Sequence, residues 1–299
     1  MNSQIVRTDI PYDYQTMVSD LEALKSAYPI IQSNTIGSSV LGKEIYTLSI
    51  GIGQRQVYYN GCHHANEWIT APLLMQFAES YAQAYQTGTT ILGWDIRYLF
   101  NHTIIWLTPM VNPDGVDLVI HGIDTSNPFY EQVLRWNNYS TNFSNWKANI
   151  RGVDLNHQYN AHWYEQKSRG PVGPSPANYS GSAPESEPES RAVADFTRYH
   201  NPNLIIAYHS QGRVIYWGYR GLEPPESQTI ATYFGTLSGY TPIRYAGTDA
   251  GYKDWFIQDW RRPGFTIEVS MGINPLPASQ LPQIYRDNLG IMLHGAGLT

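Results

Sequence analysis

Residues 58–70 read YYNGCHHANEWIT, and this segment of the 299-residue chain indicates both a fold and a site. It begins as a strand and gives way to a helix, with His64 three residues before Glu67 at the junction. Both side chains can therefore face one point. A histidine nitrogen and a carboxylate on a rigid element suit zinc, which takes a third ligand from elsewhere and keeps a fourth position for water. The alternative is an ordinary polar helix start.

Two later strands supply candidates that complete such a site. His209 follows the apolar run NLIIAY at 203–208, so it would lie at the carboxyl edge of a buried strand, where the ligands of open α/β sheets collect. Glu268 lies within FTIEVS at 265–270, and a carboxylate inside an apolar strand is costly to bury unless it is paired or performs a task. Beside a metal, it can take a proton from the attacking water and pass it to a leaving amine. The alternative is that Glu268 points to solvent.

The order of the expected elements favours a single α/β domain. Helices are expected over 14–28, 67–85, 187–200, 226–238, 252–261 and 278–294, and strands over 44–51, 56–61, 103–112, 203–210, 213–219 and 265–270. This alternation predicts a sheet with helices on both faces. Residues 113–185 are rich in turn-forming residues, and only GVDLN at 152–156 reads there as ordered apolar structure. No Pro/Ser linker and no internal repeat divides the chain.

Composition and motifs argue against several classes of protein. The net charge of −6 and the 15% of charged residues provide no basic field for nucleic acid. No run of 18 apolar residues predicts a membrane span, and the first 15 residues do not have the pattern of an export signal. No G-x-S-x-G segment points to a serine hydrolase, and GIGQRQ at 51–56 lacks the last glycine of a dinucleotide-binding fingerprint.

Five segments in order resemble the zinc carboxypeptidases typified by carboxypeptidase A. They are HANEWIT at 64–70, NPDG at 112–115, GVDLN at 152–156, HS at 209–210 and FTIE at 265–268. The resemblance implies one zinc peptidase catalytic domain over residues 1–299, with a twisted, mixed sheet of about eight strands between helices. It implies one Zn²⁺ per chain, bound by His64, Glu67 and His209, with Glu268 as the general base. By the same match Asp154 should accept a hydrogen bond from a zinc-binding histidine and fix its orientation. The alternative for Asp154 is a turn or cap role.

One departure from the family concerns the end of the substrate. Members that release a C-terminal amino acid carry an Asn-Arg pair after the Gly-Val-Asp segment, and that arginine clamps the terminal carboxylate. This chain has Asn156 and His157 there. A histidine cannot reproduce the planar fork of arginine, so recognition of a conventional C-terminus is not expected.

Three further departures concern the groups around the reacting bond. Where the family places an arginine that stabilises the oxyanion, this chain has Lys147, and Arg151 competes for the role. The arginine expected two places after the first zinc ligand is replaced by Asn66. The substrate-binding loop tyrosine of the family has Tyr245 as its substitute.

These departures occur together in the bacterial γ-D-glutamyl-L-diamino acid peptidases, which the segments at 146–159 and 265–277 resemble more than they resemble digestive carboxypeptidases. The branch implies a peptidoglycan stem peptide or muropeptide as substrate, cut between the γ-carboxyl of D-Glu and the L-centre of meso-diaminopimelate. His157, Gln211 or Arg213 would then bind the distal ammonium and carboxylate, with Asn156 at the proximal end.

Two other functions and two locations stay open at this point. One function is that of a conventional metallocarboxypeptidase. The other is a non-catalytic module that binds sugar or peptide, which Glu268 and three intact ligands argue against. The only cysteine, Cys62, cannot form an intrachain disulfide, which fits the cytoplasm without excluding the bacterial wall.

Overall fold

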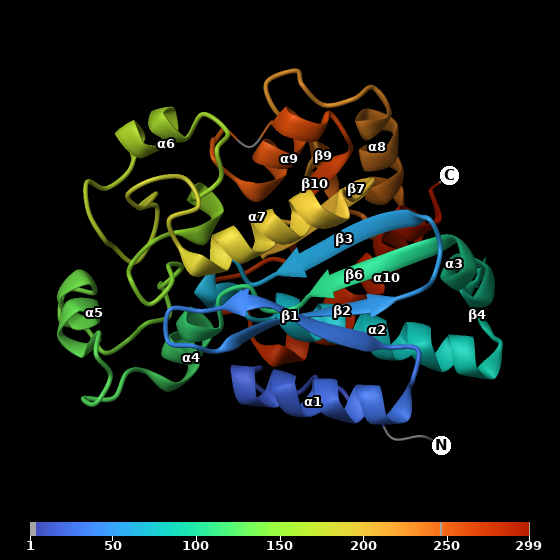
Figure 1. The fold of residues 1–299 in the computed structure, drawn as a ribbon, viewed down its shortest axis with the longest axis horizontal. Helices are drawn as coiled ribbons and strands as arrows, with labels where there is room; N and C mark the ends of the chain where they lie inside the picture. Colours follow the sequence, from blue (N-terminus) through green and yellow to red (C-terminus); the bar gives the residue numbers. More distant parts are fainter. Residues whose placement is uncertain (1–3, 246, 299) are drawn as a thin grey trace.

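The computed structural model describes residues 4–245 and 247–298 and has an eight-stranded sheet at its centre (Figure 1). Its strands are β1 (Gln32–Ser38), β2 (Glu44–Ile50), β3 (Arg55–Gly61), β6 (Thr103–Thr108), β7 (Leu204–Ser210), β8 (Val214–Tyr216), β9 (Thr241–Ile243) and β10 (Gly264–Val269), and a separate hairpin joins β4 (Thr90–Ile91) to β5 (Trp94–Asp95). The spatial order is β1-β2-β6-β3-β7-β10-β8-β9. The four central strands β6, β3, β7 and β10 are parallel, whereas β2 and β8 run antiparallel to their central neighbours. The expected mixed sheet of about eight strands is confirmed.

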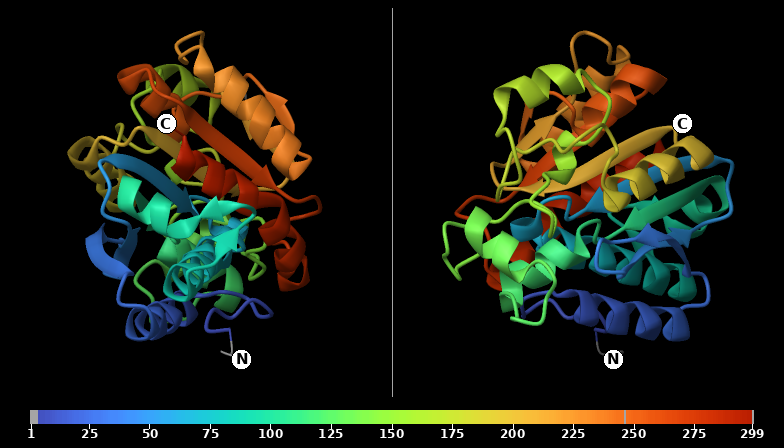
Figure 2. Two further views of the ribbon diagram at one scale, coloured as in Figure 1. Left: turned by 90° about the vertical axis from the view of Figure 1, so that its right-hand side faces the viewer. Right: turned by 60° about the vertical axis from the view of Figure 1, so that its left-hand side comes forward.

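Helices cover both faces of this sheet, as predicted (Figures 1 and 2). They are α1 (Tyr14–Ala27), α2 (Thr70–Thr87), α3 (Ile96–His102), α4 (Pro113–His121), α5 (Tyr130–Trp136), α6 (Trp163–Arg169), α7 (Pro188–His200), α8 (Glu226–Ser238), α9 (Tyr252–Trp260) and α10 (Leu281–Gly297). The larger core lies between one face and α1, α2, α8 and α10. A second core lies between the other face and α7 and α9. Within the described residues, no helix combines the length and apolarity needed to cross a membrane.

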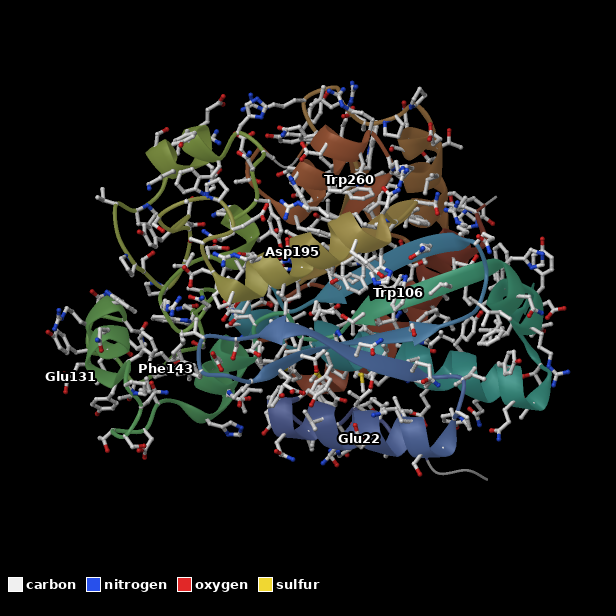
Figure 3. The ribbon with its side chains drawn as sticks, viewed as in Figure 1. Glu22, Trp106, Glu131, Phe143, Asp195 and Trp260 are labelled. Carbon is white, nitrogen blue, oxygen red and sulfur yellow. The ribbon has the colours of Figure 1, made fainter. Side chains whose placement is uncertain are left out.

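Side chains at the surface can be assigned to the two sides of the sheet. Trp106 of β6 and Trp260 at the end of α9 pack against the second core, on the side where Asp195 projects from α7 (Figure 3). Glu22 on α1 marks the opposite side. The described residues thus form one domain around one sheet. The predicted domain limits, residues 1 and 299, lie outside the described residues.

The pleat of β10 answers the question of where Glu268 points. Phe265, Ile267 and Val269 are fully buried in the larger core, so the alternating residues Thr266 and Glu268 face the other side of the sheet. Glu268 does not lie on an outer solvent face. Its side of β10 borders a cleft, and Glu268 is one of the residues that line this cleft.

The interpretation of residues 113–185 as a turn-rich stretch ordered only at 152–156 was wrong, because the stretch contains α4, α5 and α6. The start of α4 carries ordinary helix signals: Asn112 is its N-cap and accepts a hydrogen bond from the Gly115 N–H at 3.1 Å, and Pro113 occupies the first turn. α5 and α6 have only seven residues each, too few to show a helical period.

Two strands of the sheet and one helix were also missed. β1 is mostly exposed and polar, and β9 is exposed along its length, so neither has an apolar alternation. The helix α3 was not predicted either. Several ends differ by a few residues: α2 begins at Thr70 because Ala65–Glu67 form a 3₁₀ turn, and β6 ends at Thr108.

Candidate active site

Three buried side chains converge at the carboxyl edge of the central strands. The Nδ1 atoms of His64 and His209 lie 3.2 Å apart, and each lies 2.9 Å from a different carboxylate oxygen of Glu67. One ligand atom from each residue falls within 4.8 Å of the others. Two imidazole nitrogens and one carboxylate are the donor set of a catalytic zinc site, so these residues fit the ion expected from the sequence.

The sheet topology explains why residues distant in sequence meet here. β3, β7 and β10 are adjacent and parallel, so their carboxyl ends share one edge. Glu67 ends the 3₁₀ turn that follows β3, His64 is the N-cap of that turn, and His209 lies near the end of β7. Glu268 of β10 is the register partner of His209. The site therefore depends on the parallel order of three neighbouring strands.

The carboxylate of Asp154 lies beside His64. Its Oδ1 is 3.1 Å from Nε2 of His64, and its Oδ2 accepts a hydrogen bond from the Asn178 N–H at 3.0 Å. Although burial by itself lowers the pKa of His64, the carboxylates of Glu67 and Asp154 raise it to about 9. Both carboxylates thus favour positive charge on the ligand cluster, which is also what a bound metal cation requires. The Asp154 side chain also accepts from the Asn156 N–H, so the alternative turn role coexists with this contact.

Lys147 extends from the loop before α6 to the same cluster. Its Nζ lies 3.3 Å from Oε1 of Glu67, and the negative charge of Glu67 raises the pKa of this lysine. The other carboxylate oxygen of Glu67 accepts a hydrogen bond from the Ser210 N–H at 3.1 Å. Lys147 therefore places a positive charge beside the cluster of His64, Glu67 and His209.

A cleft of about 370 Å³ opens beside this cluster. It is lined by Asn66, Asn145, Lys147, Ser210, Gln211, Gly212, Val214, Tyr216, Glu268, Gly272, Ile273 and Asn274. Loss of hydration and then the negative charge of Glu67 raise the pKa of Glu268 to about 8. A cation held by the triad would oppose this shift, because it favours the ionised carboxylate. The cleft thus holds the carboxyl group of Glu268 and the ammonium of Lys147, and its lining includes Ser210, the residue after His209.

Asn156 and His157 lie next to this site but are engaged with the protein. The Asn156 Oδ1 accepts a hydrogen bond from the Tyr252 N–H at 3.1 Å. His157 is 8% exposed, and its Nδ1 lies 3.7 Å from Oδ2 of Asp154. Burial lowers the pKa of His157, so it is held as a neutral ring rather than as a second cation.

Of the predicted substrate-binding residues, Gln211 lines the cleft, whereas Asn156, His157 and three others lie outside its lining. Arg151 pairs with Glu187 at 3.5 Å. Arg213 lies over the Tyr240 ring, 5.2 Å from its centroid, and 3.9 Å from Asp287. Tyr245 borders a second cavity. Of the two candidates for stabilising the oxyanion, only Lys147 reaches the cleft.

The second cavity has a volume of about 330 Å³ and carries charges of both signs. Its lining comprises Arg169, Gly218, Tyr219, Arg220, Tyr245, Gly247, Thr248, Asp249 and Asp254. Asp249 is 4% exposed and pairs with both Arg169 and Arg220. Asp254, also buried, pairs with Lys253 at 2.6 Å.

Sequence reasoning missed several polar residues of the cleft. Asn274 is the clearest: its carboxamide donates to the Ser210 carbonyl at 2.7 Å and accepts from the Ser210 hydroxyl at 2.8 Å, which pins its loop to the end of β7. The two residues are 64 positions apart, so no local signal could show this contact. Tyr216 and Val214 lie two places apart on the same face of the strand expected over 213–219, but nothing in the sequence singled out either one.

Comparison with known proteins decides the family. The sequence pattern of peptidase family M14, described as zinc carboxypeptidase, matches residues 17–290. The chain belongs to the zinc carboxypeptidase family. This zinc carboxypeptidase is 50% identical over 284 residues to γ-D-glutamyl-L-diamino acid endopeptidase 1 of Lysinibacillus sphaericus, a match that covers 95% of the chain and 72% of the relative. It is 38% identical over 286 residues to the uncharacterised protein YqgT of Bacillus subtilis (strain 168), covering 94% and 76%.

Solved structures agree with this fold. Thrombin-activatable fibrinolysis inhibitor superposes with a TM-score of 0.74 at 20% identity, covering 99% of this zinc carboxypeptidase and 78% of that chain. The murein-tripeptide amidase MpaA of Escherichia coli O157 gives 0.56 at 17% identity, covering 89% and 93%. The family and fold expected from the sequence are thus confirmed, and the chain is a zinc-dependent metallopeptidase.

Replacing Asp154 by Ala in this zinc carboxypeptidase should weaken zinc binding by about 10- to 100-fold, because His64 would lose the partner that fixes its ring. Competition with a chromogenic chelator measures the zinc Kd. Asp154→Asn keeps an oxygen that can accept the hydrogen bond, so it should lose less affinity than the Ala variant. Equal zinc affinity in Asp154→Ala and the parent would show that the contact does not orient His64.

Proposed function

We propose that this enzyme hydrolyses the amide between the γ-carboxyl of D-Glu and the L-centre of meso-diaminopimelate in peptidoglycan stem peptides, using one zinc ion per chain. The observation that carries the proposal is the state of His157. A conventional carboxypeptidase needs an arginine fork at this position, whereas His157 is buried and held near Asp154. The 50% identity to a γ-D-glutamyl-L-diamino acid endopeptidase supports the same substrate. The two locations expected from the sequence, cytoplasm and bacterial wall, stay predictions.

The described residues provide each protein group that the hydrolysis needs. A zinc ion held by His64, Glu67 and His209 would polarise the scissile carbonyl and acidify water. Glu268 takes a proton from the attacking water as its oxygen bonds to the carbonyl carbon. The Lys147 ammonium offsets the negative charge that develops on the carbonyl oxygen. Glu268 then passes its proton to the amine nitrogen as the C–N bond breaks, and the released amine takes the remaining proton of the new carboxyl group, leaving a γ-carboxylate and an ammonium group.

The second cavity supports recognition of the distal centre of diaminopimelate, which carries both an ammonium and a carboxylate. The cavity holds arginines and aspartates within about 330 Å³. Its wall is linked to the Asp154–His157 segment, because Asn156 accepts from the Tyr252 N–H and Asp254 accepts from the Gly251 N–H. Tyr245 fits this role better than Arg213, whose guanidinium faces Tyr240 and Asp287.

The test compares kcat/KM for three substrates whose products are identified by mass spectrometry. L-Ala-γ-D-Glu-meso-diaminopimelate should be cleaved at the γ-D-Glu amide. The same peptide with lysine lacks the distal carboxylate and should be slower by about 10- to 100-fold, since one charge-assisted hydrogen bond contributes roughly 1.5–3 kcal/mol. A blocked α-linked dipeptide should be slower still. Similar values for the stem peptide and the dipeptide would instead support the conventional metallocarboxypeptidase.

A further inference from the structure

A short turn connects Lys147 and Asp154, two residues that contact the metal ligands from outside. Residues 149–153 form this turn, in which the Asn149 N–H donates to the Val153 carbonyl at 2.8 Å and the Gly152 N–H donates to the Asn149 carbonyl at 3.0 Å. Gly152 has a φ of +70°, a region that favours glycine. Lys147 precedes the turn by two residues, and Asp154 follows it directly. The turn therefore helps to set the spacing between the Lys147 ammonium and the Asp154 carboxylate, together with the hydrogen bonds that the Lys147 and Asp154 N–H groups donate to the Pro176 and Tyr179 carbonyls.

The side chain of Asn149 fixes this turn from within the protein. It is fully buried, and its Oδ1 accepts from the N–H groups of Arg151 at 3.0 Å and Val153 at 3.1 Å. Its Nδ2 donates to Oε2 of Glu187 at 3.0 Å and to Oε2 of Glu189 at 3.2 Å. All four hydrogen-bonding positions of the carboxamide are used. The turn is thereby anchored to the start of α7.

Glu189 ties the same network to a second part of the sheet. Its other carboxylate oxygen, Oε1, accepts from the Val40 N–H at 3.2 Å in the turn between β1 and β2. Asn149 thus holds the loop against two elements, and it does so without touching a metal ligand. The contacts from this loop that reach the ligands are Lys147 to Glu67 at 3.3 Å and Asp154 to His64 at 3.1 Å.

We propose that Asn149 is a positioning residue, which acts through Lys147 and Asp154 to hold Glu67 and His64 in their zinc-binding arrangement. This inference rests on the proposed function of the site. Removing the carboxamide takes four hydrogen bonds from the turn at once, so zinc affinity and kcat should fall together while KM changes little. Because Asn149 lies one step beyond the direct partners of the ligands, we expect about a tenfold loss of zinc affinity, the lower end of the range for such partners.

The first comparison uses Asn149→Ala and a matched control, Asn288→Ala. Asn288 is also a fully buried asparagine that donates two hydrogen bonds, to the Ile284 carbonyl and the Tyr240 hydroxyl, far along the chain on α10. Both variants should lower the melting temperature. Only Asn149→Ala should weaken zinc binding in a chelator competition and lower kcat at 25 °C. If the two variants behave alike, Asn149 is structural only and the inference is wrong.

The second comparison exchanges the donor and the acceptor of the hydrogen bond between Asn149 and Glu189. Asn149→Asp places a third carboxylate beside Glu187 and Glu189. Glu189→Gln replaces one carboxylate oxygen by an amide nitrogen, which cannot accept a hydrogen bond from the Val40 N–H or from Asn149. Each single variant should lose zinc affinity. The double variant should recover part of it, because the amide introduced by Glu189→Gln can donate to the carboxylate introduced by Asn149→Asp. Losses in the double variant that equal the sum of the single losses would contradict the network.

A third comparison separates this inference from the proposed function. If Asn149 acts partly through Lys147, Asn149→Ala should lower kcat by a smaller factor in a Lys147→Ala background than in the parent. An equal fold-decrease in kcat in the two backgrounds would show that Asn149 does not act through Lys147. A parent enzyme that bound no zinc or left the stem peptide uncut would refute the proposed function, whereas a zinc-loaded, active parent with an unaffected Asn149→Ala variant would refute only the inference.

Discussion

Replacing Glu268 by Gln is expected to lower kcat by about 10²- to 10⁴-fold, the usual contribution of general acid–base catalysis. The substitution keeps the size of the side chain and its place in β10, but an amide cannot accept the proton of the attacking water. Glu268 lines the cleft with Lys147 and is the register partner of His209, so the substitution removes the carboxylate proposed as the proton acceptor.

The control for this experiment must show that the site itself survives. Zinc content, measured by elemental analysis, should be unchanged in Glu268→Gln because His64, Glu67 and His209 remain. Glu226→Gln removes an exposed carboxylate at the start of α8 and should leave kcat at the parental value. A Glu268→Gln variant that turns over at the parental rate would mean that Glu268 is structural and that another group accepts the proton.

The parts of the fold that were predicted are those whose burial leaves a pattern in the sequence. β7 is buried along its whole length and reads as an apolar run that ends at His209. β1 was missed because, as an edge strand with a mostly exposed surface, it has polar residues at nearly every position. Burial requires apolar residues along β7, so that strand can be recognised in the sequence. The exposed strand β1 has no such requirement and therefore leaves no apolar pattern.

The residues of the candidate site also divide into those that the sequence could place and those that it could not. The triad and Glu268 could be assigned because each is fixed to the end of a regular strand or to the turn that follows it. Arg213 and Tyr245 could not be placed, because their directions depend on loop geometry and on local partners such as Asp287 and Arg244. The Asn149 network joins residues 38 and 40 positions apart, and no local pattern reports such a contact.

Replacing His209 by Ala is expected to remove both zinc and activity. His209 is 1% exposed, and its Nδ1 lies next to the ligand atoms of His64 and Glu67, so the variant keeps two of the three protein ligands. A catalytic zinc site requires all three to leave a single open position. His102→Ala is the matched control, because His102 is an exposed histidine on α3 and should keep full zinc occupancy.

Thermal unfolding with and without zinc distinguishes the loss of a ligand from a loss of folding. In the parent, zinc at about 1,000 times its Kd would stabilise the native state by roughly 4 kcal/mol, so a chelator should lower the Tm. In His209→Ala the same chelator should change the Tm little, because there is no bound ion to remove. The remaining contacts of Glu67 with Lys147 and with the Ser210 N–H should keep its carboxylate paired, so the variant should still unfold cooperatively. Full zinc occupancy in His209→Ala, together with a parental response to the chelator, would exclude His209 from the ligand set.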